Sequence, residues 1–154
     1  QKQQIMNIRE KIFEFVLKRQ PKRKVCMPHW DSVKSIAILY PEDSIQPIIN
    51  KLDGMGKEVI FFGMPEKKDI SWWTARPKKD MLSLLTAREF DVMIDLSQHP
   101  DLTMQYMAMH INAKFKTGRY MRDGILDMTI DTPAQETPDY LFEQVIRYLK
   151  MFGG

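Results

Sequence analysis

The chain has 154 residues, of which 44% are hydrophobic and 28% charged, a composition typical of one globular domain that needs no disulfide to fold. It contains no run of about 18 apolar residues and no signal-peptide pattern, so we expect neither a transmembrane helix nor export. The one cysteine, Cys26, cannot form an internal disulfide, which favours a cytoplasmic location.

The net charge of +3 conceals an uneven distribution. Residues 1–24 hold eight Lys and Arg side chains against two acidic ones, whereas the rest of the chain has a slight acidic excess. The basic character therefore belongs to an N-terminal arm and does not mark the whole chain as a nucleic-acid-binding fold. We divide the chain into this arm, residues 1–24, and one α/β domain, residues 25–154.

The arm begins with a predicted amphipathic helix over residues 7–20, which Pro21 ends. Its apolar stripe is formed by Ile8, Ile12, Phe15 and Val16. A basic cluster follows, consisting of Lys18, Arg19, Lys22, Arg23 and Lys24. Two interpretations stay open: a solvated linker behind a helix that packs on the domain, and a basic surface that contacts an anionic membrane, a nucleic acid or a protein partner.

The domain opens with a pattern typical of a βαβ unit. Residues 33–40 are almost all apolar, which predicts a strand buried on both faces of a parallel sheet. A helix capped by Ser44 and ending near Asp53 follows, and residues 58–63 predict the next strand. The crossover between the two strands is expected to be right-handed.

Residues 70–74 are short and β-prone, and we predict that they form a strand at the edge of the sheet. In a strand, Trp72 and Trp73 would point to opposite sides, so one of them is expected to be exposed. Cover by a neighbouring loop and a contact in a homodimer or with a ligand are the two interpretations of such a side chain.

The rest of the chain continues the alternation of helices and strands. The apolar run at residues 90–97 (FDVMIDLS) predicts a central buried strand. The other predicted elements are helices at 79–88, 100–112 and 138–151 and strands at 114–119 and 125–130. Together they predict a Rossmann-like three-layer αβα fold with a mainly parallel sheet.

Ligands of open α/β sheets bind beyond the carboxyl ends of the strands, and this rule selects a candidate cleft. Its residues are Tyr40, Glu42, Asp43, Ser44, Asp95, Ser97, Gln98 and His99. Because the sequence has neither a phosphate-binding loop nor a catalytic constellation, we favour a non-catalytic domain that binds a ligand or a protein partner. The alternative is a small enzyme in which Asp43, Asp95 and His99 perform acid–base chemistry.

Several motifs that carry known chemistry are missing. The first strand is followed by YPEDS, which has no glycine, so neither a dinucleotide fingerprint nor a P-loop is present. The acidic Glu42 and Asp43 would also repel a phosphate there. The three histidines and the one cysteine lack the spacing of a metal site. We therefore expect no classical dinucleotide, no metal and no other cofactor.

Two resemblances follow from these segments. The order SIAILYPED, GKEVIFFG, ISWW, LLTAREFDVMIDLS and INAKFKTGR resembles the N-terminal Rossmann-like half of heptosyltransferase-type (GT-B) glycosyltransferases over residues 33–119. That resemblance implies a strand order of 3-2-1-4-5-6, with residues 70–74 as the third strand. The chain lacks that family's glycine-aspartate turn and its second, nucleotide-sugar-binding domain, so transferase activity is not implied.

The whole chain also looks like a small uncharacterised bacterial family of unknown function. The features that carry this likeness are a basic arm, the strand end Asp95-Leu96-Ser97, the AKFK-G segment at 113–118 and the C-terminal helix. This second resemblance implies no activity.

Overall fold

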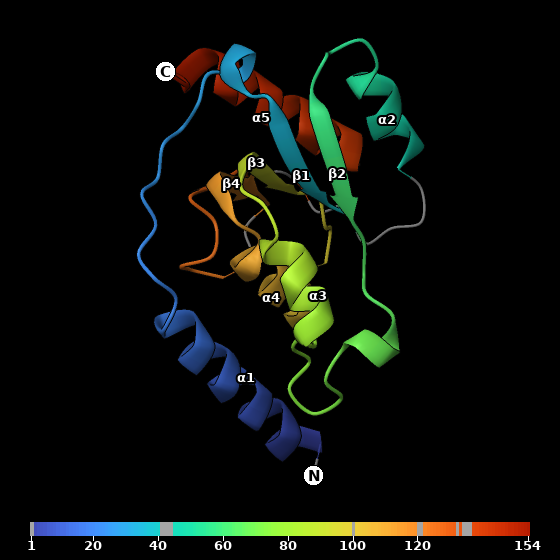
Figure 1. Ribbon diagram of the computed structural model, residues 1–154, viewed down its shortest axis with the longest axis vertical. Coiled ribbons are helices and arrows are strands. Elements are labelled where there is room, and N and C mark those ends of the chain that lie inside the picture. Colours follow the sequence, from blue (N-terminus) through green and yellow to red (C-terminus); the bar gives the residue numbers. More distant parts are fainter. Residues whose placement is uncertain (1, 41–44, 100, 120–121, 132, 134–136) are drawn as a thin grey trace.

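The computed structural model describes residues 2–40, 45–99, 101–119, 122–131, 133 and 137–154, with side chains from Asn7 onward. These residues form a five-stranded sheet in which all neighbouring strands are parallel (Figure 1). In their order across the sheet the strands are β2 (Glu58–Phe62), β1 (Ser35–Leu39), β3 (Phe90–Asp95), β4 (Ala113–Gly118) and β5 (Met128–Thr129). The predicted α/β class and the parallel sheet are confirmed.

The edge strand predicted at residues 70–74 is wrong. Residues 70–77 form a turn that closes on itself, with a single antiparallel bridge between Ile70 and Pro77 and a hydrogen bond of 2.8 Å from Ser71 N to the Arg76 carbonyl. Because this turn pairs internally, it adds no strand beside β2. The order of the other five strands agrees with the order that the resemblance implied. The last predicted strand, at 125–130, is shortened to β5.

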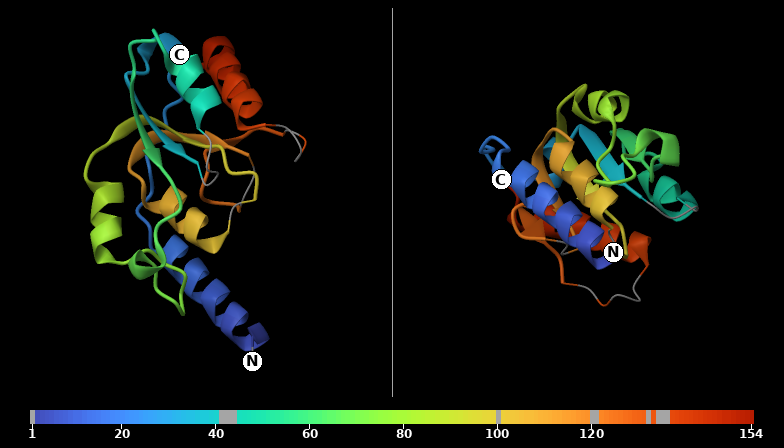
Figure 2. Two further views of the ribbon diagram at one scale, coloured as in Figure 1. Left: turned by 90° about the vertical axis from the view of Figure 1, so that its right-hand side faces the viewer. Right: turned by 90° about the horizontal axis from the view of Figure 1, so that it is seen from below.

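The helices of the described residues cover both faces of this sheet. They are α1 (Lys2–Lys18), α2 (Gln46–Leu52), α3 (Lys79–Thr86), α4 (Leu102–His110) and α5 (Pro138–Phe152), with short 3-10 turns η1 (Trp30–Ser32) and η2 (Lys67–Asp69). Figure 2 shows α2 and α5 on one side of the sheet and α3 and α4 on the other. This arrangement has the three layers that the alternating sequence predicted.

The continuous apolarity of β1 follows from its central place. Ile36 and Ile38 face the core beneath α2 and α5, whereas Ala37 and Leu39 face the core beneath α3 and α4. Because successive side chains of a strand point to opposite faces, a strand covered on both sides needs an apolar residue at every position.

Helix α1 lies outside α4 and adds to the second core. Its Phe13 is fully buried, and the Phe13 ring meets the Tyr106 ring edge-on with 4.6 Å between their centroids. In the view from below in Figure 2, α1 crosses the end of the molecule in front of α4. The predicted N-terminal helix therefore packs on the domain, and the residues that follow it run along the side of the domain towards η1 (Figure 1).

Candidate functional site

The carboxyl ends of β1, β3 and β4 meet at one edge of the sheet. Leu39 pairs with Asp95, and Asp95 pairs with Gly118. Of the predicted cleft residues, Tyr40, Asp95 and Ser97 are buried at this edge, Gln98 is half-buried and His99 is exposed. Glu42, Asp43 and Ser44 lie outside the described residues, so the acid–base hypothesis that joins Asp43, Asp95 and His99 stays a prediction.

The Asp95 carboxylate organises the turn between β3 and α4. Its Oδ1 accepts a hydrogen bond of 2.8 Å from the backbone N–H of Ser97, and both residues are 1% exposed. Asp101 then caps α4, because its Oδ1 accepts from Met104 N at 2.8 Å. Carboxylates commonly accept such hydrogen bonds at a strand-to-helix turn. The local fold therefore accounts for both bonds without a bound ligand.

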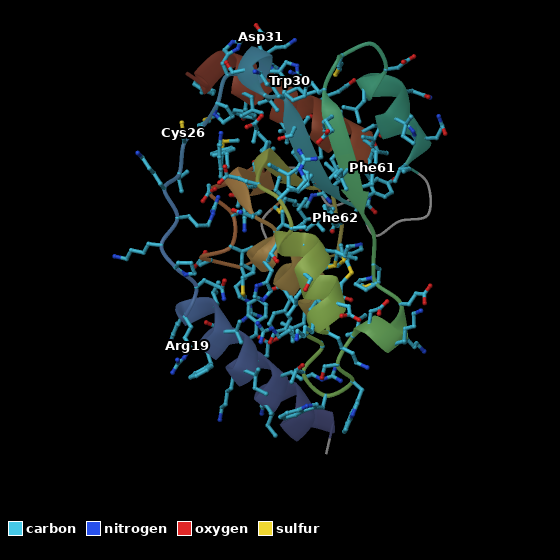
Figure 3. The ribbon with its side chains drawn as sticks, in the orientation of Figure 1. Arg19, Cys26, Trp30, Asp31, Phe61 and Phe62 are labelled. Carbon is cyan, nitrogen blue, oxygen red and sulfur yellow. The ribbon has the colours of Figure 1, made fainter. Side chains whose placement is uncertain are left out.

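The five basic residues predicted as one anionic-surface site serve different purposes. Arg23 binds both carboxylate oxygens of Asp127, at 2.7 and 2.9 Å, and also donates to the Ala113 carbonyl at 2.8 Å. The Arg19 guanidinium lies 4.2 Å from the centre of the Phe15 ring. Lys18, Lys22 and Lys24 are exposed. Figure 3 shows Arg19 on α1 and, farther along the same side of the domain, Cys26.

Lys116 is a functional candidate outside the cleft that was predicted from the sequence. It lies on β4 and is only 2% exposed, and its Nζ donates to the carbonyls of Ala108 and Met109 at 2.8 and 2.9 Å. Those carbonyls belong to the last turn of α4, whose partial negative charge suits an ammonium. Burial lowers the pKa of Lys116 to about 7, and the nearby charge of Arg23 acts in the same direction.

A second candidate joins α1 to the turn at residues 70–77. The side chains of Trp72 and Trp73 are 79% and 48% exposed. Arg9 of α1 holds this turn, because its Nε donates to the Trp73 carbonyl at 3.0 Å and its guanidinium also donates to the Trp72 carbonyl. On the other side, the Thr103 hydroxyl of α4 donates to the Ala75 carbonyl at 2.7 Å. The two indoles are therefore presented by a turn that two helices anchor.

Helix α1, which Arg9 links to this turn, carries further exposed apolar side chains. Ile8 is 45% and Phe15 56% exposed, although both belong to the stripe predicted from the sequence. The predicted stripe therefore matches the packed face only in part: Val16 packs on the core together with Phe13 and Leu17, whereas Ile8 and Phe15 do not. Three exposed cations flank the apolar side chains, namely Lys11, Lys18 and Arg19. We call Ile8, Phe15, Trp72, Trp73 and these three cations the α1–Trp face.

Two acidic residues of α1, Glu10 and Glu14, lie beside Lys11, Phe15 and Lys18, and Arg122 offsets one of their two negative charges. Arg122 donates to the carboxylates of both Glu10 and Glu14, the latter at 2.6 Å. Consistent with these bonds, the pKa of Arg122 is raised: burial opposes the shift, but the two carboxylates outweigh it. When Lys11, Lys18 and Arg19 are counted with these three groups, the net charge around the α1–Trp face is still positive.

A family model described as a family of unknown function (DUF6913) matches residues 7–152. No curated protein and no solved structure matches the chain. The family match agrees with the resemblance to an uncharacterised family, whereas the likeness to the glycosyltransferase half stays a prediction. Within the described part of the chain, no helix is both long enough and apolar enough to cross a bilayer.

Proposed function

Because the chain belongs to DUF6913, a family of unknown function, we propose its function from the geometry of its surface: a non-catalytic binding module that docks on anionic membranes through the α1–Trp face. The docking would be peripheral, with the apolar side chains entering the headgroup region and the cations meeting anionic lipids.

The exposure of Trp72 is the observation that carries this proposal. An indole that is 79% exposed leaves a large apolar surface in water, whereas Trp30 of the same chain is 5% exposed. Tryptophan is enriched where one side of a molecule is apolar and the other is wet, above all at the membrane–water interface. The anchored turn keeps the indole outside, so its exposure is part of the folded structure.

The other apolar side chains of the α1–Trp face suit a lipid surface better than a nucleic acid. Ile8 and Phe15 are exposed apolar side chains on the same helix as Arg9, which binds the tryptophan turn. Single-stranded nucleic acids stack on aromatic rings but gain little from an aliphatic side chain such as Ile8. An amphipathic, basic helix with large apolar residues is a recognised interfacial membrane element.

The cations of the face supply the preference for anionic lipid. A Lys or Arg close to an anionic leaflet contributes about 1 kcal/mol, and the contribution falls off within a Debye length. Lys11 and Lys18 are exposed, and Arg19 lies over the Phe15 ring, so its charge accompanies that ring to the surface. Binding is therefore expected to require negative lipid and to weaken with salt.

Cosedimentation with vesicles tests the proposal. The chain should bind vesicles of phosphatidylcholine mixed with phosphatidylserine, and it should bind pure phosphatidylcholine vesicles far more weakly. The double variant Trp72→Ser/Trp73→Ser should lose most of the binding. Phe152→Ser is the matched control, because Phe152 is 63% exposed but lies at the end of α5, away from α1 (Figure 1).

Two double variants test whether membrane binding requires the cations of the α1–Trp face. Lys11→Gln/Lys18→Gln removes two cations of the α1–Trp face, at about 1 kcal/mol each, and should weaken binding about thirtyfold. Lys34→Gln/Lys150→Gln removes two exposed cations at the other end of the molecule and should leave binding nearly unchanged. Equal losses in both pairs would show non-specific attraction and contradict the proposal. Binding to single-stranded oligonucleotides or to a protein, without binding to vesicles, would assign the face to that partner instead.

A further inference from the structure

A separate cavity of about 230 Å³ lies where the basic arm passes over β4 and the end of α4. Its charged lining consists of Lys22, Arg23, Lys116 and Asp127. Its volume lies below the roughly 300–1,000 Å³ that is usual for drug-sized ligands, so it suits a smaller molecule. We call it the Lys116 cavity. It shares no residue with the α1–Trp face.

Lys116 gives this cavity an amine in a fixed position, which is cationic when it is protonated. A protonated Lys116 has three N–H donors. Two of them account for the bonds to the Ala108 and Met109 carbonyls, and the third remains for another acceptor. The backbone of the same residue is also anchored, because Lys116 N donates to Asp127 Oδ2 at 2.8 Å. A charged group held by a strand and a helix terminus is better placed for recognition than one on a mobile loop.

The charges in the lining do not cancel. Asp127 is engaged by the Arg23 guanidinium and by the Lys116 backbone, so its negative charge is already paired. Lys22 has no ion-pair partner among the described residues, and Lys116 is bound only to carbonyls. Lys22, and Lys116 in its protonated form, are thus the positive charges left for a ligand. The repulsion between Arg23 and Lys116 contributes to the lowered pKa of Lys116, and a bound anion would relieve it.

The remaining walls are largely apolar. Leu17, Val25, Met109 and Ile125 contribute to the lining. A multiply charged, strongly hydrated anion such as phosphate would lose water against these side chains without replacement. We propose that the Lys116 cavity binds a small organic monocarboxylate, with its carboxylate between Lys116 and Lys22 and its short apolar chain against these walls.

Titration of the full chain with sodium butyrate, followed by ¹H–¹⁵N NMR, tests this proposal. Butyrate should shift the amide signals of Val25, Lys116 and Gly124 in a saturable manner, and butylamine should not. Inorganic phosphate is expected to bind at least tenfold more weakly than butyrate. Absence of saturation with butyrate, or tighter binding of phosphate, would overturn the proposal.

Variants separate the cavity from general electrostatic attraction. Lys116→Met keeps a side chain of similar length but removes the ammonium, and should abolish saturable butyrate binding. Lys22→Gln should weaken binding about threefold, the effect of one exposed charge. Lys24→Gln removes an equal charge outside the lining and should have no effect. Equal weakening by Lys22→Gln and Lys24→Gln would contradict the proposal.

Proton linkage provides a readout that does not depend on the folding of any variant. An anion beside Lys116 stabilises its charged form, so binding raises the pKa of that residue. One pH unit above that pKa, calorimetry in two buffers of different ionisation enthalpy should show net proton uptake on butyrate binding. Binding without proton uptake would place the carboxylate away from Lys116.

Discussion

Gly118 lies so close to Asp95 that a Cβ atom at position 118 would come within 2.5 Å of the Asp95 carbonyl oxygen. The two residues pair where β3 and β4 end, and the absence of a side chain at position 118 permits this close approach. Asp95 is itself buried and bound to the turn that follows β3, so it has little freedom to move away.

We therefore expect Gly118→Ala to destabilise the protein by about 2 kcal/mol or more, because backbone atoms cannot yield as a flexible side chain can. Its backbone φ of +155° is also one that other residues rarely adopt. The free energy of unfolding from urea denaturation measures the effect. Gly54→Ala is the control: a Cβ there meets no atom within 4 Å, so its smaller cost would reflect only its positive φ. Equal costs would contradict a steric cause at Gly118.

Helix α1 is expected to behave as part of the folded domain. Phe13→Ala removes a fully buried ring that packs on Tyr106 and should cost about 3–5 kcal/mol. Phe15→Ala removes a ring that is 56% exposed and should cost under about 1 kcal/mol. Urea denaturation of both variants checks this. Similar small costs would show that α1 contributes little to stability.

Lys116 makes stability depend on pH on the alkaline side. Its pKa in the folded protein, about 7, is below the ordinary value of 10.5, so between these values the unfolded chain binds more protons than the folded one. Stability should therefore rise with pH in this window, by at most about 1.4 kcal/mol per pH unit from this residue. Lys116→Met should flatten the rise in urea denaturation measured across the window. An unchanged profile would show that another group is responsible.

His110 has the corresponding effect on the acidic side. Its ring stacks on Tyr106, and burial followed by the charges of Arg76 and Lys116 lowers its pKa from 6.5 to about 4. Between these two values the unfolded chain again binds more protons, so stability should fall as the pH falls. His110→Gln, which does not titrate, should reduce this fall. A variant with the same acid sensitivity as the natural chain would contradict this assignment.

Sequence patterns predicted the sheet well because burial on both faces leaves a strong signal. The apolar runs that became β1 and β3 and the helices between the strands were found within a few residues of their observed bounds. The strand predicted at residues 70–74 was wrong for a reason that the composition of this segment does not reveal. Its backbone pairs with Arg76 and Pro77 a few residues later, and such local closure competes with adding a strand to the sheet.

The candidate sites were harder to predict because they depend on contacts between residues that are far apart in the sequence. Lys114 and Lys116 lie two residues apart on β4 and point to the same face, yet only Lys116 is covered by the end of α4. The approach of Gly118 to Asp95 depends on strand register, which alternation alone does not give. On α1, Ile8 and Phe15 had the spacing of a packed stripe, but Phe13 is the residue that is buried. When a helix has apolar residues on two sides, their spacing alone does not reveal which side packs on the domain.

The environment of the exposed tryptophans on lipid is the most direct test of the proposed function. Trp30→Phe leaves Trp72 and Trp73 as the tryptophans of the chain, because the sequence has three. On mixed phosphatidylcholine–phosphatidylserine vesicles their emission should shift to shorter wavelength, and brominated lipid should quench it. Emission that stays at its solvent-exposed wavelength, with no quenching, would show that the α1–Trp face does not enter the membrane and would contradict the proposal.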